Sequence, residues 1–197
     1  MSVDLATIAV YDARADEYTR IMTRDGPDAT LKAFIAALPN CARVLDLGCG
    51  PGRAAGHMAA AGLRVDAMDA SAEMVTLAAQ VPGVTVWQGT FDDLVAEAVY
   101  DGIWANFSLL HALRGDLPRY LAAIAKALKP GGKLHVGMKL GTGEARDKVG
   151  RRYTYVTDDE LTGLLRDVGL RVHRRQFGAG RGLDGAMSDW ICVTAHD

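Results

Sequence analysis

Two spacings of apolar residues alternate along the chain from about residue 43 onward. Short apolar runs of strand length alternate with segments in which apolar residues recur at the spacing of one face of an α-helix. Strands are therefore expected at residues 43–48, 64–69, 84–89, 100–106, 133–139, 170–177 and 189–196. Helices are expected between them at 53–62, 71–80, 116–132 and 157–169, and two earlier helices at 4–22 and 28–38.

Residues that typically start and stop helices support these assignments. Ser71 stands where an N-cap side chain accepts a backbone hydrogen bond, and Thr157 is followed by Glu160 at the spacing of a capping box. The helix at 116–132 has an acid in its first turn, lysines in its last, and Pro-Gly-Gly at its end. The pattern therefore predicts helices with defined ends, joined to strands by short turns.

Strands that alternate with helices form a mostly parallel sheet with helices on both faces. The last two strands have no helix between them, so we expect them to form an antiparallel hairpin at one edge. The fold class is α/β, a Rossmann-like sheet. The length of 197 residues, without internal repeats or low-complexity linkers, indicates one domain, with a helical part at 1–40 and the α/β core at 41–197.

The composition narrows the compartment and the partners. Hydrophobic residues make up 49% and charged residues 23%, and the net charge of -2 provides no field for nucleic acid or an anionic membrane. Cys41, Cys49 and Cys192 form no C-x-x-C pair, so neither a disulfide framework nor a metal site is expected. Acids interrupt the N-terminal apolar residues, and no apolar stretch approaches the ~20 residues of a membrane span. A soluble cytoplasmic protein is expected.

The stretch VLDLGCGPGR at 44–53 places three glycines, Gly48, Gly50 and Gly52, directly after the first expected strand. In open parallel sheets, ligands bind beyond the carboxyl ends of the strands, and glycines let the backbone turn sharply and approach a ligand closely. Asp69 ends the second strand, 21 positions after Gly48, the spacing at which a carboxylate accepts hydrogen bonds from ribose hydroxyls. The pattern predicts a ligand that carries adenosine.

NAD is the competing ligand. Its fingerprint is G-x-G-x-x-G, whereas the third glycine here comes one place early and Arg53 occupies the fingerprint position. Asp46, at the end of the first strand, would repel a diphosphate and attract an ammonium group. An NAD(P)-dependent oxidoreductase is therefore the less favoured enzyme.

The motif DLGCGPG at 46–52 resembles the first motif of the class I S-adenosylmethionine-dependent methyltransferases, D/E-x-G-x-G-x-G. The resemblance continues along the chain in VDAMDAS, GTFDDL, YDGIWANFSLLHAL and ALKPGGKLHV. It implies a seven-stranded sheet in the order 3-2-1-4-5-7-6 with the last strand antiparallel. It also implies a methyltransferase that uses S-adenosylmethionine and releases S-adenosylhomocysteine.

The resemblance implies a cofactor role for seventeen positions: Tyr11, Tyr18, Asp46, Gly48, Cys49, Gly50, Gly52, Arg53, Asp69, Ala70, Ser71, Met74, Thr90, Phe91, Asp92, Asn106 and Phe107. In this assignment the methionyl amino group lies beside Asp46, the ribose beside Asp69, and the adenine between Met74 and Phe91. Either Asp92 or Asp93 is the partner of the adenine amine. Arg53 pairs with the methionyl carboxylate, and Asn106 and Phe107 lie beneath the methionine.

Several of these residues have explanations that need no ligand. Asp46 can cap the turn that follows it, and Asp69 can belong to the N-cap region of the next helix. Tyr11 and Tyr18 are seven positions apart and share one helical face, so they either close over the cofactor or belong to a core.

The acceptor side is expected after the fourth and fifth strands. His111 follows the fourth strand and is either a helix-surface histidine bonded to backbone or a group that binds the acceptor or removes its proton. The loop at 139–157 is charged and too long for a tight connection, and it forms either a solvated hairpin or a cover for the acceptor. Its candidate acceptor-binding residues are Lys139, Arg146, Tyr153 and Tyr155, with Glu144, Arg151 and Arg152 nearby.

The predicted function is methyl transfer to a small molecule, which the arginines suggest is anionic. A missing general base would not argue against such an enzyme, because alignment of the reacting groups supplies most of the rate. The alternatives are the NAD(P)-dependent oxidoreductase and a non-catalytic module that binds S-adenosylmethionine. A protein acceptor is also open.

Overall fold

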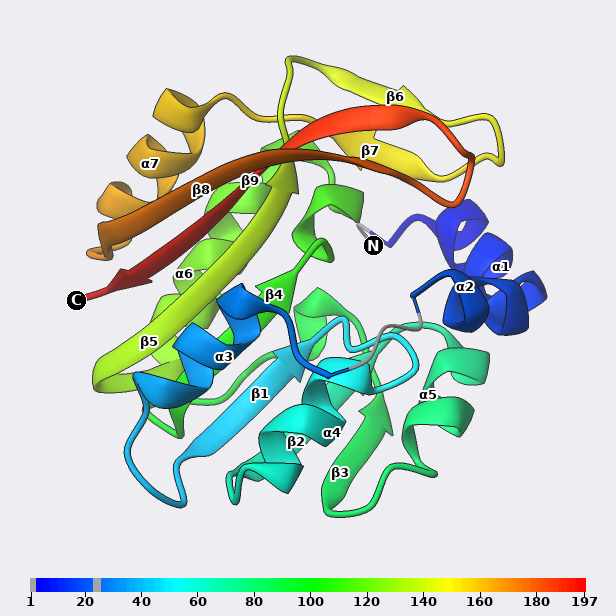
Figure 1. Ribbon diagram of the computed structural model, residues 1–197. Coiled ribbons are helices and arrows are strands. Elements are labelled where there is room, and N and C mark those ends of the chain that lie inside the picture. The colour runs from blue at the N-terminus through cyan, green and yellow to red at the C-terminus, as the bar shows by residue number, and fades with distance from the viewer. Residues whose placement is uncertain (1–2, 23–25) are drawn as a thin grey trace.

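The computed structural model describes residues 3–22 and 26–197. Within these residues seven strands form one sheet in the order β3-β2-β1-β4-β5-β9-β8, and β6 pairs with β7 in a separate hairpin (Figure 1). The main strands are β1 (Arg43–Leu47), β2 (Arg64–Asp69), β3 (Val84–Gln88), β4 (Tyr100–Asn106), β5 (Leu128–Lys139), β8 (Arg171–Arg181) and β9 (Met187–His196). The hairpin strands are β6 (Glu144–Arg146) and β7 (Arg152–Thr154).

The first five strands pair in parallel, whereas β9 runs antiparallel to both β5 and β8. Because β8 and β9 are the sixth and seventh strands of this sheet, the expected order and the expected edge hairpin are confirmed. The carboxyl ends of β1, β2 and β4 therefore meet at one edge, where the order reverses between β1 and β4.

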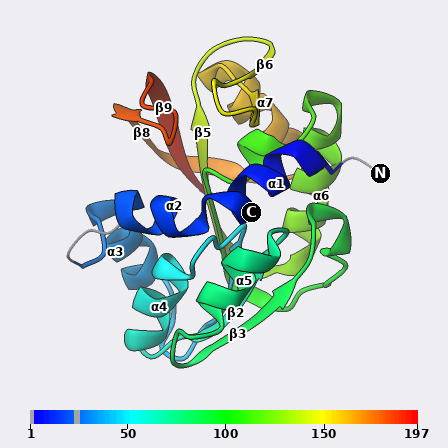
Figure 2. The ribbon, with the colours of Figure 1, turned by 90° about the vertical axis from the view of Figure 1, so that its right-hand side faces the viewer.

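Helices cover both faces of the sheet. They are α1 (Leu5–Ala13), α2 (Ala15–Met22), α3 (Ala29–Ala36), α4 (Arg53–Ala60), α5 (Ala72–Ala78), α6 (Leu117–Ala127) and α7 (Asp158–Asp167). Three short 3₁₀ helices are η1 (Phe91–Asp93), η2 (Leu109–His111) and η3 (Arg114–Asp116). Figure 2 shows α3 and α4 on one side of the sheet and α6 and α7 on the other.

Each face has its own hydrophobic core, because side chains alternate along a strand. On β1, Val44 packs with residues of α3 and α4, whereas Leu45 and Leu47 pack with residues of α6. On β4, Trp104 belongs to the first core and Ile103 to the second. Because of this alternation Asp46, two positions after Val44, also faces α4.

The helix ends agree with the sequence in two places. The Ser71 hydroxyl accepts from the backbone N–H of Met74, and the Thr157 hydroxyl accepts from that of Glu160, so both expected N-caps are confirmed. The expected helix at 4–22 is instead two helices, because at Arg14 the backbone leaves the helical region, with φ −126° and ψ 26°.

The helix expected at 116–132 ends early, at Ala127. Residues 128–132 already belong to β5, and Leu128 pairs with Tyr100 of β4. Pro130 has no N–H to donate to a further helical turn, so the strand begins before the two glycines rather than after them.

The long loop at 139–157 contains the β6–β7 hairpin, in which Ala145 pairs with Tyr153. Among the described residues, no helix combines the length and apolar character that a membrane crossing requires.

Candidate functional site

A cavity of about 880 Å³, counting the part open to solvent, lies at the carboxyl ends of β1, β2 and β4. Figure 2 shows α1 lying across this end of the sheet. Of the residues expected at the site, those that line the cavity are Tyr11, Tyr18, Gly48, Gly50, Asp69, Ala70, Ser71, Met74, Thr90, Phe91, Asn106, Phe107 and His111. Those that do not line it are Asp46, Cys49, Gly52, Arg53, Asp92, Lys139, Arg146, Tyr153 and Tyr155.

The glycine turn forms one wall of the cavity. Gly48 and Gly50 have φ values of 74° and 53°, which L-residues with side chains rarely adopt. A β-carbon on Gly48 would lie 2.3 Å from the β-carbon of Ser108. The turn after β1 can therefore touch the end of β4 only because Gly48 has no side chain.

Asp69 joins this turn to the end of β2. Its Oδ2 accepts from the backbone N–H of Gly50 at 2.7 Å, and its Oδ1 accepts from that of Ser71 at 3.0 Å. Burial raises the pKa of the carboxyl group, and the backbone hydrogen bonds oppose this effect. A carboxylate at this place can accept hydrogen bonds from sugar hydroxyls at the mouth of the glycine turn.

Asp46 lies behind the turn. It faces α4, as the strand alternation that places Val44 in the α4 core requires, and its Oδ2 accepts from the backbone N–H of Ala55 at 3.0 Å. Burial raises the pKa of Asp46 to about 7. This geometry matches the capping explanation, in which the carboxylate braces the first turn of α4.

The side expected to hold adenine is apolar. Met74, which is 1% exposed, lines the cavity together with Thr90 and Phe91. The two candidate acids point elsewhere, since Asp92 pairs with Arg119 and Asp93 Oδ2 accepts from the backbone N–H of Thr90 at 2.7 Å. Neither acid lines the cavity.

Three further residues of the glycine stretch do not line the cavity. Arg53 donates to the backbone oxygen of Gly26 at 2.7 Å. Cys49 is buried, and burial raises the pKa of its thiol. A β-carbon on Gly52 would lie 3.0 Å from that of Ala78, so Gly52 lets α4 and α5 pack closely.

The first helix supplies residues that sequence reasoning missed. The missed lining residues are Val3, Asp4, Thr7, Ile8, Leu47, Met68, Gly89, Ser108, Ala112 and Tyr120. Helical spacing could have identified three of them. Asp4, Thr7 and Ile8 precede Tyr11 by seven, four and three positions and so share its helical face.

Tyr11 and Tyr18 belong to different helices but still meet. Their ring centroids are 5.4 Å apart with the rings nearly perpendicular. Tyr18 also approaches the glycine turn, since a β-carbon on Gly50 would lie 3.5 Å from its ring. Both rings therefore close the cavity from the side of α1 and α2.

His111 lies in a chain of hydrogen bonds. Its Nε2 is 2.8 Å from the Tyr11 hydroxyl, and its Nδ1 is 2.6 Å from the backbone oxygen of Arg152. Because a carbonyl oxygen only accepts, Nδ1 carries the hydrogen and Nε2 accepts from Tyr11. Burial lowers the pKa of His111 to about 4, so the ring is neutral at neutral pH.

The residues expected to bind the acceptor make contacts within the hairpin and with α1. Arg146 forms two hydrogen bonds with Asp4, at 2.9 and 2.7 Å. Lys139 places its Nζ 3.8 Å from the centre of the Tyr153 ring, and burial lowers the pKa of its ammonium group. Tyr155 packs against the second hydrophobic core.

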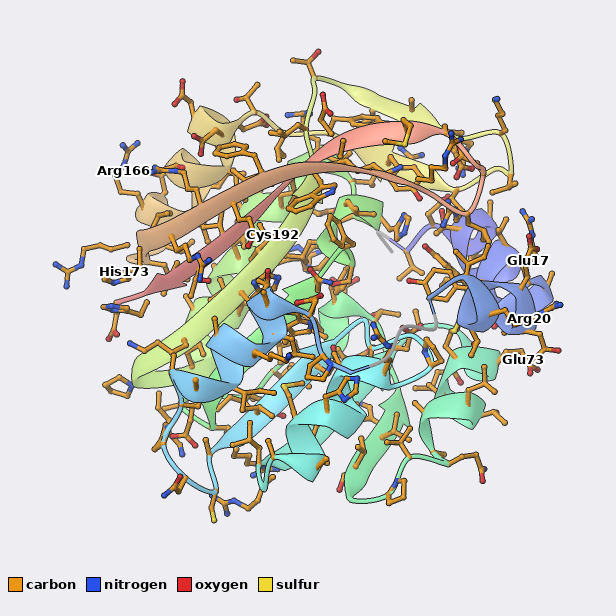
Figure 3. The ribbon with its side chains drawn as sticks, viewed as in Figure 1. Glu17, Arg20, Glu73, Arg166, His173 and Cys192 are labelled. Atoms are coloured by element: carbon orange, nitrogen blue, oxygen red, sulfur yellow. The ribbon has the colours of Figure 1, made fainter. Side chains whose placement is uncertain are left out.

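A second hollow lies between α2 and α5 on the outer surface. Its charged lining includes Glu17, Arg20 and Glu73, which Figure 3 shows on the exterior beside these helices. These are solvated side chains of both signs, and the hollow is separate from the glycine turn.

The cavity suits S-adenosylmethionine by the chemistry of its lining. Its lining includes bare backbone at Gly48 and Gly50, the carboxylate of Asp69 and the apolar side chain of Met74. These are the groups that an amino-acid tail, a ribose and an adenine require, in that order.

Comparisons with known proteins find methyltransferases. A model of the methyltransferase domain family matches residues 44–132. The chain is 35% identical over 132 residues to the cypemycin N-terminal methyltransferase of a Streptomyces species, covering 63% of this chain and 54% of the relative. It thus spans about half the length of that relative. It is 29% identical over 197 residues to the ubiquinone biosynthesis O-methyltransferase of Xanthomonas axonopodis pv. citri (strain 306), covering 82% of each chain.

A similar fold occurs in a solved structure. It is the crystal structure of Burkholderia thailandensis 1,6-didemethyltoxoflavin-N1-methyltransferase with bound 1,6-didemethyltoxoflavin and S-adenosylhomocysteine. The TM-score is 0.75 at 24% identity, and the match covers 98% of this chain and 88% of that chain. The domain match over residues 44–132, together with the sheet order and this similar fold, supports the assignment of a class I S-adenosylmethionine-dependent methyltransferase.

Proposed function

We propose that this chain transfers a methyl group from S-adenosylmethionine to a small-molecule acceptor. One observation carries the proposal: a single cavity joins the glycine turn, the Asp69 carboxylate, the Met74 side chain, Tyr11 and His111. The first three suit the cofactor, and the last two leave polar groups where an acceptor would enter.

The cofactor-binding roles follow from which groups face the cavity. Backbone at Gly48 and Gly50 would hold the amino-acid tail, Asp69 the ribose hydroxyls, and Met74 with Phe91 the adenine. When bound, S-adenosylmethionine supplies a methyl group already activated on a sulfonium sulfur. The chain's own task is then to align the acceptor and exclude water, which α1 and Tyr18 favour by covering the cavity.

The acceptor is, in this proposal, small and neutral. Among the lining residues that the structure describes there is no lysine or arginine. The cations that suggested an anionic acceptor have other partners: Arg146 pairs with Asp4, Arg151 with Asp147, and Lys139 lies over Tyr153. Apolar lining from Val3, Ile8 and Phe107 also favours an uncharged molecule.

Two of the relatives support a small acceptor by their names, whereas the Streptomyces relative is named for the N-terminus of cypemycin. The Xanthomonas relative is a ubiquinone biosynthesis O-methyltransferase, and the Burkholderia structure holds 1,6-didemethyltoxoflavin. Neither name assigns an acceptor to this chain, so the class of molecule rests on the cavity lining.

Calorimetry with S-adenosylhomocysteine tests the cofactor part. We expect Asp69→Asn to weaken binding by about 10-fold or more, because hydrogen bonds to a charged group contribute about 1.5–3 kcal/mol. Asp101→Asn is the matched control, since Asp101 begins β4 at the opposite end of the sheet and bonds to Arg43 and Lys129. A wild-type chain that does not bind S-adenosylhomocysteine would remove the proposal.

A mass-spectrometric screen tests the acceptor part. Pairs of phenols and amines with and without a carboxylate are incubated with S-adenosylmethionine, and methylated products are counted. We expect products from the neutral member of each pair. Products from the carboxylates alone would show the acceptor to be anionic.

A further inference from the structure

Arg151 is a charged side chain that neither the cofactor nor the acceptor proposal uses. It is 2% exposed, and its Nε and Nη2 both bond to Asp147 Oδ2, at 2.9 and 2.7 Å. Asp147 is 4% exposed in its side chain, and its other oxygen accepts from the backbone N–H groups of Val149 and Arg151. Asp147 therefore holds the guanidinium in one orientation.

The remaining arm of Arg151 points at the cavity wall. Its Nη1 lies 2.9 Å from the hydroxyl oxygen of Tyr11, and its Cζ lies 5.3 Å from the centre of the Tyr11 ring. A guanidinium only donates, so the Tyr11 oxygen must accept this bond. The Tyr11 hydrogen is then left to point at His111 Nε2, 2.8 Å away.

In this series of hydrogen bonds, the donor and the acceptor of each bond follow from the chemical groups at its two ends. Arg151 donates to Tyr11, Tyr11 donates to His111, and His111 donates to the backbone oxygen of Arg152. The two ends are a donor that cannot accept and an acceptor that cannot donate. Tyr11 and His111 both line the cavity, whereas Arg151 does not.

We propose that Arg151 is a positioning residue that holds the Tyr11 hydroxyl as a donor to His111, so that Tyr11 and His111 act together as the proton acceptor for the methyl-accepting group. The inference rests on the proposed function. The acceptor heteroatom bonds to the methyl carbon as the carbon–sulfur bond breaks and its electron pair stays on sulfur. The acceptor's proton passes to the Tyr11 oxygen, while the Tyr11 proton passes to His111 Nε2.

The surroundings of His111 suit a neutral ring that gains a proton briefly. The titratable and charged groups that face it are Tyr11 from α1, Tyr153, Arg151 and Asp147 from the hairpin segment, and Lys139 from β5. Burial and the two cations hold the pKa of His111 low, which keeps its Nε2 lone pair available and lets the proton leave again.

Nitrogen-15 NMR of the His111 ring in the full chain tests the arrangement without an acceptor. We expect a protonated-type Nδ1 and an unprotonated, hydrogen-bonded Nε2, assigned with His111→Gln. Tyr11→Phe should move the Nε2 resonance to that of a free imidazole nitrogen. Arg151→Lys, which keeps a charge beside Asp147, should produce at least half of that shift.

A double variant covers the case in which a single change at Arg151 prevents folding. Arg151→Met with Asp147→Leu removes the buried pair as a unit, which is less costly than removing one partner. It should also produce at least half of the Tyr11→Phe shift, and the triple variant with Tyr11→Phe should shift no further than Tyr11→Phe alone, because the effects share one contact. Arg146→Met is the matched control on the same hairpin and should leave the His111 resonances in place.

The outcomes separate this inference from the proposed function. Folded Arg151 variants whose Nε2 resonance stays within a tenth of the wild-type position would overturn the role of Arg151, whatever S-adenosylhomocysteine binding shows. Normal S-adenosylhomocysteine binding by these variants, with kcat reduced about 10-fold or more and the KM for S-adenosylmethionine unchanged, is the expected kinetic result. Loss of S-adenosylhomocysteine binding in the wild type would instead remove the proposed function and leave the hydrogen-bond chain standing.

Discussion

The two walls of the cavity are held in different ways. The floor, formed by Gly48, Gly50 and Asp69, is fixed by backbone: Gly48 and Gly50 have positive φ, and Asp69 accepts from the Gly50 N–H. The roof is formed by α1, which the segment of the β6–β7 hairpin holds in place from outside the cavity. The side chains that join them are 140 and 142 positions apart, in the pairs Tyr11–Arg151 and Asp4–Arg146.

The floor and the roof should therefore respond differently to amino-acid substitutions and to pH. A backbone-built floor is sensitive to added volume, because no side chain can move aside for it. A roof held by charged pairs is sensitive to charge, pH and burial, because the strength of each pair depends on how far water is excluded.

The largest effect is expected in the buried part of the roof. Arg151→Met leaves Asp147 without its partner at 4% exposure, and breaking a buried ion pair costs about 3–5 kcal/mol of unfolding free energy. Urea denaturation at neutral pH measures this. A loss below about 1 kcal/mol would show that Asp147 finds another partner or water, and that the roof does not depend on this pair.

The floor should respond to a single methyl group. Gly48→Ala places a β-carbon 2.3 Å from that of Ser108 at a φ of 74°, so left-handed strain of about 1–2 kcal/mol adds to an overpacking cost of about 1–3 kcal/mol. Gly62→Ala is the control, because Gly62 has a φ of 85° but nothing within 4 Å of the added carbon. Equal losses in both variants, measured by urea denaturation, would contradict the close contact between the floor and Ser108.

Acid should weaken the roof through His111. Its folded pKa of about 4 lies below the ordinary value of 6.5, so the unfolded chain binds the proton more readily between these values. The stability contribution is fully present above pH 6.5 and is lost as the pH falls toward 4, by at most about 1.4 kcal/mol per pH unit. His111→Gln should therefore lose less stability than the wild type between pH 6.5 and 5.

The pH dependence of stability must be compared between the wild type and His111→Gln, because Asp46 changes the stability in the opposite direction. Its folded pKa of about 7 lies above the ordinary value of 3.8, so the native state gains stability as the pH falls through this range. Asp46 is present in both the wild type and His111→Gln, so its contribution cancels in the difference between them. His173→Gln, an exposed residue of β8 (Figure 3), is the control and should match the wild type more closely than His111→Gln does.

The smallest effect is expected at the exposed end of the roof. Arg146 is 43% exposed in its side chain, and its hydrogen bonds to Asp4 hold the pKa of that carboxyl well below its ordinary value. Asp4 is 12% exposed in its side chain, but water reaches the Arg146 end and screens the pair, so Arg146→Met should cost about 1 kcal/mol, and high salt should reduce the difference. If Arg146→Met cost as much unfolding free energy as Arg151→Met, burial would not explain a difference in strength between the Asp4–Arg146 and Asp147–Arg151 pairs.

Hydrophobic spacing and the motif series predicted the sheet, its order and its edge hairpin. They also predicted the glycine turn and Asp69 at one site, because these lie at strand ends whose meeting follows from the strand order. The placement of Asp46 shows where this reasoning stopped short. Alternation along β1 puts it on the side of Val44, toward α4, and the same period-two rule was available from the sequence.

The pairings within the roof could not be predicted from the sequence. Lys139 and Arg146 were expected to bind the acceptor because long loops over the carboxyl edge of a sheet usually carry specificity, but the partner of a cation is decided by what lies beside it after folding. Asp4 is separated from Arg146 by 142 positions, and no spacing rule connects them. The break at Arg14 likewise placed Tyr11 and Tyr18 on two helices instead of one.

Local periodicity and residues a few positions apart were sufficient to predict the α/β architecture and the backbone turn that faces the cavity, and the resemblance to a known family supplied the strand order. Which charges are neutralised and how Tyr11 and His111 are oriented became clear only from the three-dimensional arrangement. The physical reason is that burial and pairing set the energy of a charge, and both depend on neighbours that are distant along the chain.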